Sequence, residues 1–145
     1  MEDFVPYELA KKLKEKGFSC EIPFAMYNEI ARFHLLTTAA PMTVCASGFK
    51  CREYYDYEDF DEHGYIAPTI YQVLKWLREE YRLHIEPRIL TDSDVNADTY
   101  WKFSVLSART GYTLYYEYNH IDDKRFETYE AAALAGVAYC LENLI

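Results

Sequence analysis

The clearest periodic pattern in the chain runs over residues 67–82, APTIYQVLKWLREEYR. Apolar residues recur there at helical spacing, so they share one face of an α-helix. They are Ile70, Val73, Leu74, Leu77 and Tyr81. Pro68 fits the first turn of a helix, where a missing N–H costs no hydrogen bond. The pattern therefore predicts an amphipathic helix over residues 67–82, with Trp76 beside the apolar stripe.

Two further helices are predicted. Residues 6–16 open with a proline and carry Leu9 and Leu13 on one face, and Gly17 follows as a left-handed stop. Residues 128–144 open with Thr128, a residue type whose hydroxyl commonly caps a helix N-terminus. The many alanines and the glycine in this last segment predict a helix that packs closely on a sheet.

Alternating apolar and polar residues predict strands in the second half of the chain. Residues 83–90 read as extended, and 91–98 as a loop. Residues 100–106 and 112–118 alternate on either side of the turn sequence ARTG, which is typical of a β-hairpin.

Strand signals are weaker between the first two helices. Residues 18–27 are expected to form a short extended segment, and Pro23 favours a sheet edge. Residues 28–40 fit either a helical turn capped by Asn28 or a strand. Their β-branched residues favour a strand near 32–38.

The following segment predicts a second hairpin. Residues 42–46 and 49–57 alternate on either side of Ser-Gly, a turn dipeptide. In residues 49–57 the tyrosines lie mostly on one face and charged residues on the other, as in a strand with one solvated face. Residues 58–65 are expected to be an acidic connection to the helix that follows.

These elements do not alternate regularly between strand and helix. We therefore predict an α+β fold, an antiparallel sheet with about three helices packed largely on one face. No repeat, linker or change of composition divides the chain, so a single α+β domain over residues 1–145 is expected.

Charge narrows the classes of partner. The chain carries 24 acidic and 15 basic residues, a net charge of −9, which disfavours direct binding to nucleic acid or an anionic membrane. One lysine cluster stands out in the sequence, within residues 11–16, and it reads as the solvated face of a helix. No signal peptide or membrane-length apolar run is evident, so a cytoplasmic protein is expected.

Cysteine and histidine patterns give no catalytic motif. Cys20, Cys45, Cys51 and Cys140 are irregularly spaced, which suits buried small residues better than a zinc site. Phosphate loops, dinucleotide fingerprints and nucleophile elbows are not found. The sequence thus leans away from an enzyme and predicts no cofactor.

Two acidic stretches imitate calcium-binding loops. An EF-hand loop needs a glutamate at its twelfth position, but Ile70 and Phe103 stand there instead. We therefore expect no metal site, and the residues that would supply ligands are only weak candidates. They are Asp59, Asp61, His63, Asp92, Asp94, Asn96 and Asp98.

Tyrosine is unusually frequent, with 15 copies. Tyrosine gives rigid, amphipathic contact area and is enriched at protein interfaces, although it also suits half-buried strands. The aromatic residues offered as partner contacts are Tyr54, Tyr55, Tyr57, Trp76, Tyr115, Tyr116 and Tyr118.

Three segments resemble a known group of proteins: APTIYQVLKWLREEYRLHI, TYEAAALAGVAYCLENLI and the opening FVPYELAKKLKEKGF. They are similar to small uncharacterised proteins of gut anaerobic bacteria and of their prophages or mobile elements. The resemblance covers about a third of the chain and implies an α+β domain of unknown function. It transfers no catalytic residue.

The favoured hypothesis is a non-catalytic protein-interaction module, carried by a phage or mobile element, that binds a protein partner or itself. One alternative is a small-molecule-binding or hydrolytic domain built from Tyr, His and carboxylate side chains. Another is a nucleic-acid mimic, because six acids fall within residues 53–62.

Overall fold

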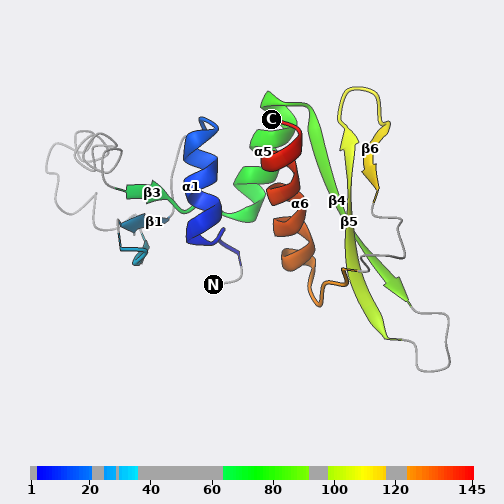
Figure 1. The fold of residues 1–145 in the computed structure, drawn as a ribbon, viewed down its shortest axis with the longest axis horizontal. Helices are drawn as coiled ribbons and strands as arrows, with labels where there is room; N and C mark the ends of the chain where they lie inside the picture. The colour runs from blue at the N-terminus through cyan, green and yellow to red at the C-terminus, as the bar shows by residue number, and fades with distance from the viewer. Residues whose placement is uncertain (1–2, 21–24, 29, 36–63, 92–97, 117–123) are drawn as a thin grey trace, which may run out of the picture. The chain divides into compact units, whose positions relative to one another are not determined.

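The computed structural model describes residues 3–20, 25–28, 30–35, 64–91, 98–116 and 124–145. This part of the chain forms three helices and two three-stranded antiparallel sheets (Figure 1). The predicted α+β class with about three helices is confirmed. The described strands form two sheets, whereas the sequence suggested one.

Contacts within the chain divide it into two compact units. One unit comprises residues 4–69, and the other comprises residues 1–3 together with 70–145. The single domain expected over residues 1–145 stays a prediction, and each unit is described by itself. In neither unit is a described helix both long and apolar enough to cross a membrane.

Helix α1, Tyr7–Glu15, opens the unit of residues 4–69 and confirms the helix predicted at 6–16. Its buried face includes Leu9 and Leu13. Gly17 ends it with a φ of 77°, a conformation that glycine adopts without steric cost. The Phe18 N–H then donates at 2.9 Å to the Leu13 carbonyl, which also accepts the Lys16 N–H at 3.1 Å, so the chain turns tightly at the helix end.

The same unit contains the sheet β2-β1-β3. Strand β1 is Ala25–Asn28, β2 is Phe33–Leu35 and β3 is Gly64–Ile66. The ambiguous segment after residue 28 is thus a strand, as favoured. Asn28 caps a turn rather than a helix, since its side-chain oxygen accepts the N–H groups of Ile30 and Arg32 at 3.1 and 2.9 Å.

Strand β3 corrects one expectation. Residues 64–65 were expected to belong to an acidic connection, but Tyr65 pairs with Tyr27 in an antiparallel ladder. A three-residue strand is too short to show an alternating pattern, and only its distant partner defines it. The hairpin predicted at 42–46 and 49–57 lies outside the described residues, as does most of the loop predicted at 91–98.

Helix α5, Ile70–Glu80, opens the second unit and leads into the sheet β4-β5-β6. Strand β4 is Leu83–Thr91, β5 is Thr99–Ser107 and β6 is Thr113–Tyr116. All three were predicted, including the β5–β6 hairpin. Pro87 lies in the middle of β4, which is an outer strand of this sheet, where a missing N–H is tolerated.

Helix α6, Tyr129–Asn143, packs on β4 and β5 and lies with α5 on one face of the sheet (Figure 1). The Thr128 hydroxyl caps it as predicted, accepting the Ala131 N–H at 3.1 Å. Gly136 lies against the sheet so closely that a Cβ there would stand 2.6 Å from Cγ2 of Ile85. The predicted close packing of this helix is therefore observed.

The covered face of the sheet forms the core of this unit. Side chains alternate along each strand, so Ile85, Phe103 and Val105 face α6 while their neighbours face the opposite way. Val137 and Cys140 of α6 are fully buried against them. The other face of the sheet carries the even-numbered residues of β4 and β5.

Candidate functional site

Most of the residues singled out in the sequence lie outside the part of the chain that the structure describes. For them the proposed roles stay predictions. They are Tyr54, Tyr55, Tyr57, Asp59, Asp61, His63, Asp92, Asp94, Asn96 and Tyr118.

Trp76 belongs to the buried face of α5 rather than to a position beside it. Its side chain is only 8% exposed, and its ring meets Tyr81 edge-on with centroids 5.0 Å apart. Tyr81, expected within the apolar stripe, is 38% exposed. Trp76 thus stabilises its own unit, and little of its surface is left for a partner.

Tyr115 is half-buried and packs against α6. Its ring stacks on Tyr139 of α6 at a centroid distance of 3.9 Å and on Phe103 at 5.5 Å. The backbone of Tyr116 pairs with Ser104 of β5. The stacking holds β6 against α6 through contacts within the chain.

Of the acidic candidates for a metal site, Asp98 is the one that lies in the described part of the chain. Asp98 is exposed just before β5 begins. Among the described side chains, no three from His, Cys, Asp and Glu lie close enough together to hold a metal ion. The described residues therefore form no candidate metal site.

Two cysteines are described, and burial disfavours the thiolate form of both. It raises the pKa of the Cys140 thiol from 9.0 to about 12 and that of Cys20 to about 11. The thiolate is the nucleophilic form, so a raised pKa lowers reactivity at neutral pH. Neither thiol is suited to nucleophilic catalysis.

This burial gives a testable prediction about thiol reactivity. In a variant carrying Cys45→Ser and Cys51→Ser, the two remaining thiols should react with an aromatic disulfide reagent about 10²-fold or more slowly than free cysteine. The rate should rise with pH, because a raised pKa shifts thiolate formation to higher pH. The reaction rate is measured by absorbance at neutral pH, before and after addition of denaturant. Rapid labelling of the native protein would contradict the assignment.

Apolar side chains reach the surface at the end of the β4–β5 ribbon farthest from the α5–β4 turn. Ile89 is 56% exposed and pairs across the ladder with Trp101. Trp101 meets Tyr129 edge-on at 5.6 Å, and Tyr129 is itself 41% exposed. Ile89, Trp101 and Tyr129 are called the ribbon patch.

The ribbon patch exists because α6 begins at Tyr129. Residues of β4 and β5 nearer the α5–β4 turn are covered by the helix, whereas Ile89 lies on the same face beyond that cover. The sequence did contain a signal. Ile89 and Leu90 are consecutive apolar residues of one strand, so they point to opposite faces and both cannot enter the same core.

The unit of residues 4–69 has its own aromatic cluster. The Tyr7 ring contacts Tyr27 at 5.6 Å and Tyr65 at 5.4 Å, and burial raises the pKa of Tyr27, whose hydroxyl donates to the Val5 carbonyl at 2.8 Å. These contacts tie α1 to its sheet, and they explain Tyr7, Tyr27 and Tyr65 as packing residues.

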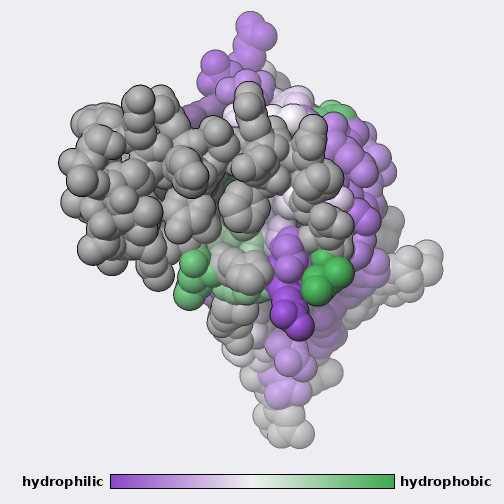
Figure 2. All heavy atoms as spheres, turned by 90° about the vertical axis from the view of Figure 1, so that its left-hand side faces the viewer, coloured by the Kyte–Doolittle hydropathy of each residue, from purple (hydrophilic) through white to green (hydrophobic). Residues whose placement is uncertain are grey.

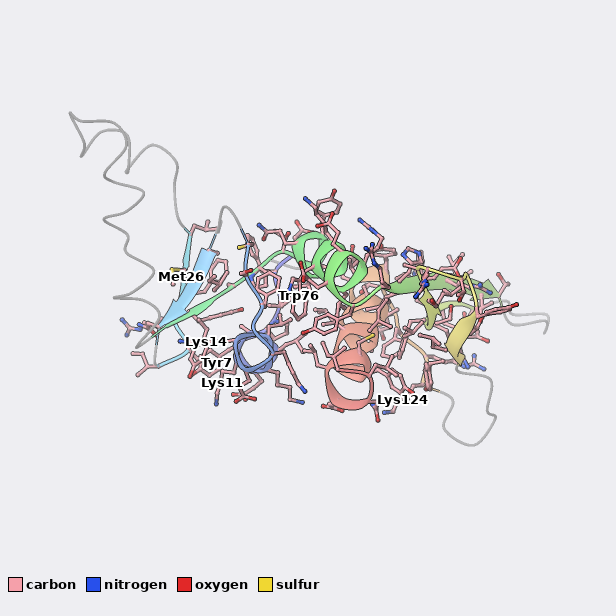
Figure 3. All side chains as sticks on the ribbon, turned by 90° about the horizontal axis from the view of Figure 1, so that it is seen from above. Tyr7, Lys11, Lys14, Met26, Trp76 and Lys124 are labelled. Carbon is pink, nitrogen blue, oxygen red and sulfur yellow. The ribbon has the colours of Figure 1, made fainter. Side chains whose placement is uncertain are left out.

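Two lysines of the sequence cluster take part in this packing. Lys11 lies 5.6 Å from the centroid of the Tyr7 ring, and Lys14 lies 5.3 Å from that of Tyr65 while donating to the Gly64 carbonyl. Figure 3 shows Tyr7, Lys11 and Lys14 on the same side of α1. The predicted solvated face thus includes cations held over aromatic rings.

Apolar residues of this unit are also exposed in the β1–β2 turn and at the opposite end of β2. Ile30 is 70% exposed and Leu35 is 60% exposed. Figure 2 shows hydrophobic and hydrophilic side chains of the described residues side by side on one face. Singly exposed apolar residues are normal on protein surfaces, so these two carry less weight than the ribbon patch.

Comparison with known proteins gave no match: no family model, curated protein or solved structure is significantly similar to the chain. The resemblance to proteins of gut anaerobes and their mobile elements therefore stays a prediction.

Proposed function

We propose that the protein is a non-catalytic protein-interaction module that contacts its partner through the ribbon patch. The observation that carries this proposal is the exposure of Ile89 beside the Trp101–Tyr129 pair, at the end of the ribbon that α6 leaves uncovered. Contiguous apolar side chains on the surface commonly mark a site of protein contact.

The composition of the patch supports the same proposal. Tryptophan and tyrosine are enriched among the residues that dominate binding energy at interfaces, since they bury much area at a low entropic cost. The edge-on ring pair already fixes both rings, so little further ordering is needed on binding. Such a preorganised aromatic pair suits a contact surface.

Photo-crosslinking tests the proposal. The Ile89→p-benzoylphenylalanine variant should form an adduct of defined mass, either with a second copy or with one protein in extracts of the cells that encode it. The matched control is Tyr71→p-benzoylphenylalanine, because Tyr71 is 70% exposed on α5 of the same unit. The control should give no such adduct.

A second substitution shows whether the ribbon patch is responsible for adduct formation. Adding Tyr129→Ser to the crosslinking variant should weaken the association by about 1–2 kcal/mol, roughly five- to thirtyfold, as expected for an aromatic contact residue. Titration of adduct yield against concentration measures this. A strict monomer in light scattering without any adduct, or equal adducts from positions 71 and 89, would overturn the proposal.

A further inference from the structure

We draw no further inference here: the strongest candidate, the outer edge of β4 beside the ribbon patch, would take an added strand, but Pro87 interrupts its row of N–H groups and nothing in the structure shows what covers it.

Discussion

Phe103→Ala is expected to lower the free energy of unfolding by about 3–5 kcal/mol, which is typical of removing a buried phenylalanine side chain. Phe103 is only 7% exposed and lies at the centre of an aromatic cluster. Its ring is 5.5 Å from Tyr115, 6.1 Å from Phe126 and 6.3 Å from Tyr139, measured between centroids. Denaturant unfolding followed by circular dichroism measures the loss.

The same sheet offers a control for this substitution. Tyr112→Ala removes an aromatic ring that is 75% exposed, so it should change the free energy of unfolding by about 0.5 kcal/mol or less. If Phe103→Ala cost no more than Tyr112→Ala, the packing of α6 on the sheet as described would be wrong.

Gly136→Ala is expected to destabilise the protein although alanine is the better helix former. The new Cβ would stand 2.6 Å from Cγ2 of Ile85 and 3.1 Å from Cδ2 of Phe103, both closer than ordinary contact. Overpacking of this kind costs about 1–3 kcal/mol, against a gain of about 1 kcal/mol in helix propensity. A lower denaturation midpoint with an unchanged slope is the expected result.

Two further variants separate the cost of overpacking from the gain in helix propensity. Ala135→Gly, next to Gly136 in α6, changes helix propensity in the opposite direction and should cost about 1 kcal/mol. Ile85→Ala removes the methyl group that the new Cβ would meet, so Gly136→Ala should cost less in that background than in the wild type. Strict additivity of the two substitutions would show that the close contact between Gly136 and Ile85 is absent.

The helices could be predicted because their signals are local. Thr128 caps α6, Gly17 ends α1 with a positive φ, and each acts within one turn of its own position in the sequence. The β5–β6 hairpin is local as well, since a short turn joins its strands. These elements need no knowledge of distant partners.

The division into two sheets could not be read from the sequence. Strand β3 pairs with β1 across a long stretch of intervening chain, and such pairing depends on tertiary contacts that no short pattern encodes. The buried stripe predicted on α5 is confirmed at Ile70, Val73 and Leu77, but its edge differs from the prediction. Tyr81 lies beyond the end of α5 at Glu80, and Trp76 completes the buried face instead.

The candidate sites were hard to predict for the same reason, because contacts between distant residues define them. Tyrosine enrichment pointed to contact residues, but for Tyr115 the structure supplies partners within the chain, Phe103 and Tyr139. The ribbon patch was not predicted, because Ile89, Trp101 and Tyr129 are far apart in the sequence. Only the β4–β5 register and the contact between Trp101 and Tyr129 bring them together.

Pro87, in the middle of β4, affects how this protein can associate through its strand edges at high concentration. An outer strand with a full row of N–H and C=O groups can template the addition of another strand, which is the first step of fibril growth. Pro87 interrupts that row at its midpoint. The ribbon can therefore offer its side chains to a partner while its backbone resists open-ended polymerisation.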